Sequence, residues 1–333
     1  MKSWLAQWFM APPALRPAIA GPAPGATGTP HERAARCEGE PLAALESTAT
    51  ELEILAWITE GAALSVGPAG PRERAALRSL DRLLADTSTH PRLLPRAAAV
   101  IPPLLARLRD PRLSLAELTP QVACDVTLAA EVIRTANSAR YRGGAVVTVL
   151  DHAVRQLGID GLRSAIARAV LKPLMDRRSS PLAARCAARL WEHTDRKAQL
   201  CSALARDAGI DPFEACLAGM AHNAVWSAVL RTLDETEGDR PWHLGPSFAH
   251  ALGMRRDRLF AVVAQQWQLA DWLAPADANA APMHLLHRAE GLAWLLCMPD
   301  RPCATALAEP LLRNADATLR ECYDALATGP AGH

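Results

Sequence analysis

Apolar residues recur along most of this chain every three or four positions, which is the spacing of one face of an α-helix. The clearest case is 181–207, whose apolar positions predict one long amphipathic helix. The same periodicity predicts further helices at 41–61, 72–86, 256–268, 281–297 and 305–326. The pattern therefore predicts a protein built mainly of helices.

Local start and stop signals define helix boundaries between these stretches. Ser114 and Glu117 have the spacing of a capping box, in which each side chain bonds the other residue's free backbone N–H. Such signals predict three further helices: 126–137 after Asp125, 149–157 closing at Gly158, and 212–233 after Asp211. The Gly245-Pro246 pair, flanked by His243 and His250, is expected in a loop.

The expected fold class is all-α, a multi-helix bundle with a partly irregular N-terminal extension. Alternation of β-branched residues is nearly absent outside 145–150, and alanine, leucine, arginine and glutamate, all strong helix formers, dominate the composition. Composition shifts predict four parts: an N-terminal segment with a Pro/Gly-rich linker (1–40), a helical extension (41–90), the main domain (91–300), and a C-terminal helix and tail (301–333).

Charge and cysteine content narrow the class of protein. The net charge is +1, which gives no electrostatic case for binding nucleic acid. No apolar run reaches the roughly 18 residues that a membrane span requires. The eight cysteines show neither a C-x-x-C pair nor zinc-finger spacing, so we expect reduced thiols in a cytoplasmic protein. We also expect no cofactor.

Several short motifs stand in a fixed order along the main domain. They are Leu94-Pro95, Ala136-Asn137-Ser138-Ala139-Arg140-Tyr141, Leu157-Gly158, Trp191-x-His193, Leu217-Ala218-Gly219-Met220-Ala221-His222-Asn223 and Gln265-Gln266-Trp267-Gln268-Leu269. In this order they resemble the HDOD domain, a family related to the HD and HD-GYP phosphohydrolases. The resemblance covers roughly 91–300 and implies an HD-like helical bundle.

The Asn137-Ser138 pair ends an apolar helix just before Tyr141. An asparagine amide bonds exposed backbone groups at a helix end, so the residues themselves indicate a structural cap. A ligand-binding role is the alternative, and the spacing alone does not support it.

The resemblance also locates a degenerate metal site. HD hydrolases hold metal with a histidine on one helix, an adjacent His-Asp pair on the next, and a distant aspartate. The candidates here are His193 and His222, but Asn223 stands where the pair has its aspartate. An amide oxygen carries no charge and cannot bridge two metals as a carboxylate does. We therefore expect no metal, and two histidines held by hydrogen bonds; no fourth ligand can be assigned, although Asp257 and Asp271 lie downstream.

His284 and His287 lie three positions apart on a predicted helix and so share a face. No carboxylate stands directly beside them, which makes the pair weak evidence for metal. Arg288 and Glu290 follow, and we interpret this as a solvated face.

HDOD proteins are, by the same resemblance, bacterial signal-transduction components. The expected function is therefore a non-enzymatic regulatory or scaffolding role with protein partners. Two alternatives remain open. One is a residual metal-dependent phosphohydrolase acting on nucleotides or cyclic dinucleotides. The other is a module that binds a nucleotide without cleaving it.

Overall fold

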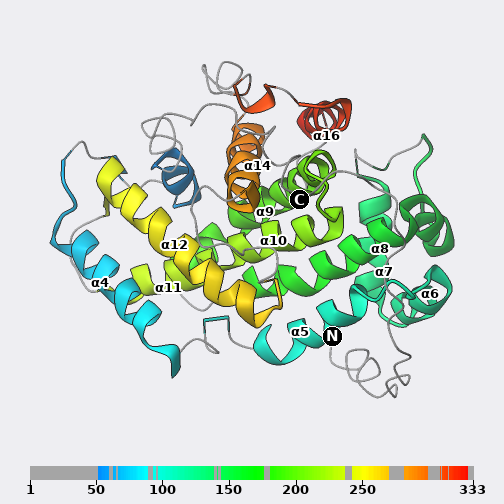
Figure 1. Cartoon of the computed structure of the whole chain (residues 1–333), viewed down its shortest axis with the longest axis horizontal. Helices are drawn as coiled ribbons and strands as arrows, with labels where there is room; N and C mark the ends of the chain where they lie inside the picture. Colours follow the sequence, from blue (N-terminus) through cyan, green and yellow to red (C-terminus); the bar gives the residue numbers. More distant parts are fainter. Residues whose placement is uncertain are drawn as a thin grey trace, which may run out of the picture.

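The structure is a computed structural model, and it describes residues 52–59, 63–64, 67–88, 93–94, 97–138, 141, 144–175, 181–236, 242–269, 281–298, 308, 310–313 and 315–328. The predicted segment 1–40 and Asp271 lie outside the described residues. Within them the fold is all-α (Figure 1), apart from one parallel pairing of two short strands.

The elements follow one another along the chain without any larger sheet in the described part. A helix over 52–58 comes first. It is followed by β1 (Ala63–Leu64), α4 (Pro71–Ala85), α5 (Ala97–Leu108), α6 (Leu115–Ala123), α7 (Val126–Ala136), α8 (Leu150–Met175), α9 (Pro181–Asp207), α10 (Pro212–Ala224), α11 (Trp226–Glu235), β2 (His243–Leu244), α12 (Pro246–Gln266), α14 (Ala281–Cys297) and α16 (Ala317–Thr328).

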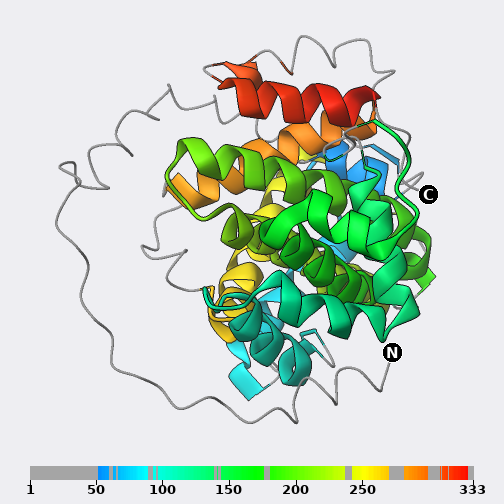
Figure 2. The ribbon, with the colours of Figure 1, turned by 90° about the vertical axis from the view of Figure 1, so that its right-hand side faces the viewer.

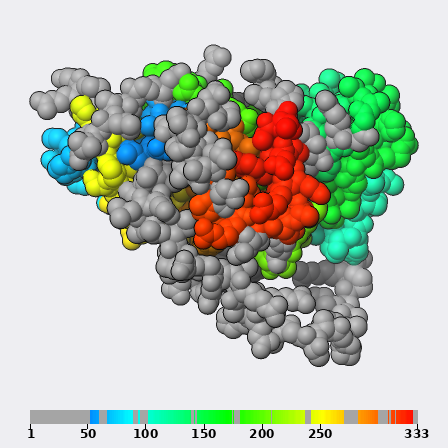
Figure 3. Space-filling model, turned by 90° about the horizontal axis from the view of Figure 1, so that it is seen from above, coloured from blue at the N-terminus to red at the C-terminus, as the bar shows by residue number. Residues whose placement is uncertain are grey.

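The centre of the molecule is the antiparallel pair α9 and α10, which pack closely against each other. Helix α8 covers one side of this pair, α12 and α11 the other, and α14 and α16 lie across α9 (Figure 2). Viewed from above, α14 and α16 form the orange and red centre of one face (Figure 3). Polar side chains on the inward faces of α9 and α10 are therefore enclosed by neighbouring helices.

Several predicted boundaries are confirmed. Helix α9 spans the predicted 181–207, and α14 spans the predicted 281–297. The Ser114 hydroxyl accepts a hydrogen bond from the Glu117 backbone, and the Glu117 carboxylate accepts one from the Ser114 backbone, so the capping box is present. Asp125 caps α7 by accepting from the backbone N–H of Leu128.

Several boundaries differ from the sequence-based prediction, among them the starts of α12 at Pro246 instead of 256 and of α16 at Ala317 instead of 305. The helix expected to close at Gly158 continues as α8 after a kink, because only Gly158 leaves helical geometry, at φ 64° and ψ −172°. The helix expected over 212–233 is broken at Val225 into α10 and α11. The Gly245-Pro246 pair does not lie in a loop: Pro246 is the first residue of α12, where its missing N–H removes no helical bond.

One continuous apolar core joins the described helices. Its largest buried side chains are aromatic, including Trp267, Trp294, Phe248 and Phe260. The extension predicted over 41–90 also contributes, because Leu55 and Leu80 belong to the same core. Among the described helices, none combines the length and the apolar character that crossing a membrane requires.

Candidate functional site

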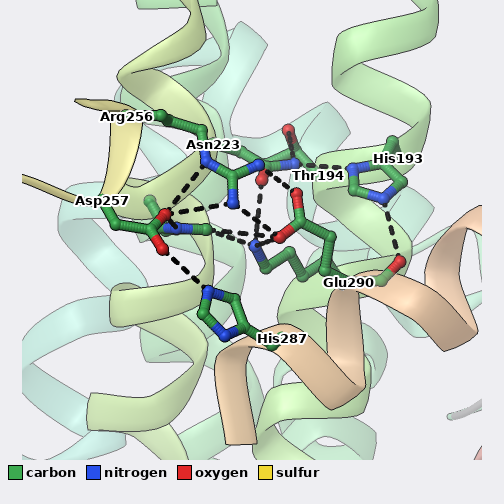
Figure 4. A network of polar contacts seen from close by, with 9 residues as sticks. His193, Thr194, Asn223, Arg256, Asp257, His287 and Glu290 are labelled. Atoms are coloured by element: carbon green, nitrogen blue, oxygen red, sulfur yellow. Dashed lines mark hydrogen bonds and ion pairs between the residues drawn. The ribbon is translucent and has the colours of Figure 1, made fainter. Parts of the chain in front are cut away.

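Four helices direct polar and charged side chains into one buried cluster at the centre of the fold (Figure 4). On α9 and α14 some of these residues lie about one turn apart and share a helical face, whereas α10 and α12 each supply two adjacent residues. The cluster consists of His193, Thr194 and Lys197 from α9, His222 and Asn223 from α10, Arg256 and Asp257 from α12, and His287 and Glu290 from α14.

Lys197 lies at the centre of this cluster and its side chain is 0% exposed. Its ammonium donates a short hydrogen bond to Nδ1 of His222 and another, of 3.2 Å, to Oδ1 of Asn223. The third contact joins Nζ to Oε2 of Glu290 at 3.4 Å. Three acceptors match the three N–H groups of an ammonium, whereas a neutral amine has only two. Burial lowers the pKa of Lys197, and the Glu290 carboxylate opposes that shift.

The partners of His222 determine which of its ring nitrogens carries the proton. Nδ1 accepts from Lys197, so Nε2 is protonated and donates to Oδ1 of Asp257 at 2.9 Å. Burial, together with the nearby positive charges of Lys197 and Arg256, lowers the pKa of His222 to about 3. The ring is therefore neutral near pH 7, with both nitrogens bonded.

His193 is likewise a neutral, fully bonded imidazole. Its Nε2 donates to the backbone oxygen of Glu290 at 3.2 Å, and its Nδ1 accepts from Nδ2 of Asn223 at 2.8 Å. Burial lowers the pKa of His193 to about 4. The second N–H of the Asn223 amide donates to the hydroxyl of Thr194 at 3.0 Å. The amide thus donates twice and accepts once, which a carboxylate at this position would not do.

Arg256 pairs with both carboxylates of the cluster. Its Nη2 lies 3.0 Å from Oε2 of Glu290 and 3.1 Å from Oδ1 of Asp257. Burial by itself would raise the pKa of Glu290, but Arg256 and Lys197 outweigh it and hold that pKa well below its usual range. Burial also opposes ionisation of Asp257, but Arg256 and two histidine hydrogen bonds hold its pKa well below the usual range. Both carboxylates are therefore ionised.

The cluster is balanced in charge and closed to solvent except at one edge. Two cations, Lys197 and Arg256, face two carboxylates, and both buried imidazoles are neutral. At the open edge His287, which is 43% exposed, donates from Nε2 to Oδ2 of Asp257 at 2.9 Å. His193 and His222 are completely buried, so neither can touch a ligand from outside.

A divalent metal does not fit between His222 and Asn223, because the Lys197 ammonium already bonds the atoms that would hold it. A second donor set is closer to the edge. His222, Asp257 and His287 offer ligand atoms that all lie within 4.8 Å of one another. However, Nε2 of His222 carries a proton while Nδ1 accepts from Lys197, so its lone pair is not free for a metal.

The profile of the HDOD domain matches residues 94–279, more than half of the chain. The chain belongs to the HDOD family. The match lies within the 91–300 region in which the motifs stand. No curated protein matches this HDOD protein in sequence.

Three solved structures are similar to this chain. A candidate metal-dependent phosphohydrolase of Shewanella amazonensis SB2B is 17% identical with a TM-score of 0.48, and the alignment covers 78% of this chain and 99% of that protein. An HDOD domain protein of unknown function from Geobacter sulfurreducens is 17% identical with a TM-score of 0.45, covering 84% of this chain and 98% of that protein. A second candidate phosphohydrolase from the Shewanella strain is 22% identical with a TM-score of 0.42, covering 76% and 98%.

The Asn137 motif of this HDOD protein lies away from the buried cluster, at the end of α7. The Asn137 amide donates to the backbone oxygens of Ile133 and Val147 and accepts from the backbone N–H of Val147 at 2.8 Å. The Ser138 hydroxyl donates to a backbone oxygen one turn earlier. The amide of Gln156 bonds the backbone oxygens of Ala136 and Tyr141. These bonds join α7 and α8 to the segment between them.

Sequence patterns did not identify four members of the cluster as site residues: Thr194, Lys197, Arg256 and Glu290. The interpretation of Glu290 as part of a solvated face was wrong, since it is 4% exposed and ion-paired. A signal did exist on α9, where Lys197 interrupts the apolar stripe that includes Leu190 and Leu204. A charged residue in such a stripe indicates a buried partner, although it does not say which.

Proposed function

We propose that this HDOD protein acts without catalysis, as a regulatory or scaffolding protein in bacterial signal transduction. The observation that carries the proposal is the position of Lys197, whose ammonium bonds both His222 and Asn223. Metal-dependent hydrolysis requires a divalent cation that binds and activates water. A buried lysine among the candidate ligands leaves no room for that cation or its water.

The burial of the histidines supports the same proposal. A catalytic group must reach the substrate or a water molecule beside it. His193, His222 and Asn223 are completely enclosed by the helices around them, and every hydrogen-bonding group of their rings and amide already has a protein partner. The cluster therefore serves to hold four helices together, and the proposed function lies on the outer surface, in contacts with protein partners in the cytoplasm.

A residual metal-dependent hydrolase is the second candidate, and one observation favours it. His222, Asp257 and His287 bring two imidazoles and a carboxylate together at the open edge. Two histidines and one carboxylate form a common site for divalent transition metals. Binding there would require His222 to release its Nε2 proton, and Arg256 and Lys197 would both repel the incoming cation.

The test is a combined measurement on the purified full chain. Metal content is determined by elemental mass spectrometry after exposure to manganese, iron and zinc. Hydrolysis of nucleotides and cyclic dinucleotides is measured in parallel, with the His287→Ala variant as the matched control. We expect no bound metal and no hydrolysis. Metal-dependent hydrolysis that disappears in His287→Ala would establish the second candidate and overturn the first.

A further inference from the structure

Three acceptor atoms from two helices converge on one point in the interior of the protein. They are Nδ1 of His222 and Oδ1 of Asn223 from α10, and Oε2 of Glu290 from α14. One nitrogen and two oxygens, one of them anionic, form a donor set suited to a cation. The atom at that point is Nζ of Lys197, which reaches it from α9.

We infer that Lys197 is a built-in cation that takes the place of a metal ion between α9, α10 and α14, and that this lysine, rather than Asn223, keeps metal out. The sequence alone predicts that metal does not bind because position 223 lacks the aspartate. The geometry assigns the exclusion to the side chain that fills the position. The inference rests on the same Lys197 contacts as the proposed function and adds which residue excludes the metal, whatever partner the protein has.

The charge balance of the cluster supports this role. With Lys197 and Arg256 positive and Asp257 and Glu290 negative, the enclosed charges cancel. A divalent ion added to this arrangement would leave two uncompensated positive charges in a buried site, which is strongly unfavourable. Loss of the Lys197 charge together with a new carboxylate at position 223 would leave two negative charges, which one divalent ion would neutralise.

The hydrogen bonds of Asn223 fit a lysine rather than a metal ion at this point. Its amide oxygen accepts from Lys197, while its two N–H groups donate to His193 and Thr194. An asparagine therefore bonds the lysine and the neutral His193 at once. Restoring an aspartate alone would place a carboxylate beside the ammonium, and the two would form an ion pair without opening space for metal.

The test compares four forms of the full chain: the parent, Asn223→Asp, Lys197→Ala, and the double variant. Each also carries His287→Ala, so that metal bound at the open edge of the cluster is not counted. Manganese and zinc are the probes, their content is measured by elemental mass spectrometry after desalting, and thermal unfolding is followed with and without each metal. Circular dichroism checks that each form is helical.

We expect the parent and Asn223→Asp to bind no metal and to show no shift in unfolding temperature when metal is added. The double variant should retain about one ion per chain and unfold at a higher temperature with metal than without it. Lys197→Ala, which lacks the new carboxylate, should bind more weakly than the double variant.

Metal retained by Asn223→Asp at the level of the double variant would overturn the inference, because the lysine would then not be the barrier. A folded double variant that binds no metal would overturn it as well. If the double variant does not fold, Asn223→Asp decides alone, since the inference requires that it bind no metal. None of these outcomes depends on hydrolysis by the parent chain, so the failure of this inference is distinguishable from that of the proposed function.

Discussion

Lys197 donates to the amide oxygen of Asn223 across 3.2 Å, inside a helical bundle where neither side chain reaches solvent. The contact joins a residue one turn after His193 on α9 to the residue that follows His222 on α10. His222 and Asn223, which the HD resemblance associates with metal binding, are therefore hydrogen-bonded to Lys197.

Replacing Lys197 with methionine should destabilise the protein by about 3–5 kcal/mol. The substitution keeps the apolar stem but removes the ammonium, which leaves acceptors on His222 and Asn223 without their donor. Urea-induced unfolding measures the loss. Lys172→Met is the matched control, because Lys172 lies 5.5 Å from the Trp191 ring centre and should contribute less than about 1 kcal/mol. Equal losses in the two variants would contradict the central role of Lys197.

Stability should fall as the pH is lowered from 7.5 to 5. Burial lowers the pKa of His193 to about 4 and of His222 to about 3, against 6.5 for an exposed histidine. At a pH between the folded and unfolded pKa values, these two histidines are protonated in the unfolded chain but neutral in the folded chain. The stabilisation is complete above the unfolded pKa and is lost as the pH falls toward the folded values. Each histidine should account for about 2 kcal/mol at pH 5.

The pH effect is measured as the change in free energy of unfolding between the two pH values. The exposed His152 gives the control, since His152→Gln should leave the change as it is in the parent. The depressed pKa values of Asp257 and Glu290 act in the same direction at still lower pH, where protonation of these carboxylates removes their ion pairs. A stability that is flat from pH 7.5 to 5 would show that the buried histidines are not neutral.

Asn137→Ala should cost about 2–4 kcal/mol. The amide makes three hydrogen bonds to backbone groups, two of them to Val147, and alanine leaves these groups without a partner. Ser138→Ala removes a single bond to a backbone oxygen and should cost about 1 kcal/mol. Both values come from urea-induced unfolding. A larger loss for Ser138→Ala than for Asn137→Ala would contradict a capping role for the asparagine.

Gly158→Ala should cost about 1–3 kcal/mol even though a new Cβ would meet no atom within 4 Å. The penalty comes from the backbone, because φ 64° with ψ −172° is a combination that side chains of L-residues disfavour. Asparagine, which often replaces glycine in left-handed helix ends, should not rescue the position. The measurement is again the free energy of unfolding of each variant.

Gly209 provides the contrast to Gly158. It lies just after α9 and has φ 67°. At this helix end the N–H of Gly209 donates to the backbone oxygen of Arg206, and the N–H of Ile210 donates to the backbone oxygen of Ala205. This is the usual glycine end of a helix, which tolerates asparagine. Gly209→Asn should therefore lose less stability than Gly158→Asn, and the reverse order would contradict this account of the kink.

The sequence by itself determined the helices and several of their ends. The period of the apolar residues located α9 and α14, and the capping residues Ser114 and Asp125 located the starts of α6 and α7. These features are local, since a helix and its cap depend on residues within a few positions of one another. The family relationship also followed from short motifs read in order along the chain.

Tertiary structure alone decided how the polar residues combine. Lys197 and Glu290 lie far apart in the sequence, and no periodic pattern predicts that α9 and α14 cross where their charges meet. Tertiary packing also decided the break at Val225 and the start of α12 at Pro246. Where the local sequence allows more than one helix boundary, packing selects one of them. Local propensity is weak compared with burial of an apolar face, and a buried charge is stable only beside a partner that the whole fold brings to it.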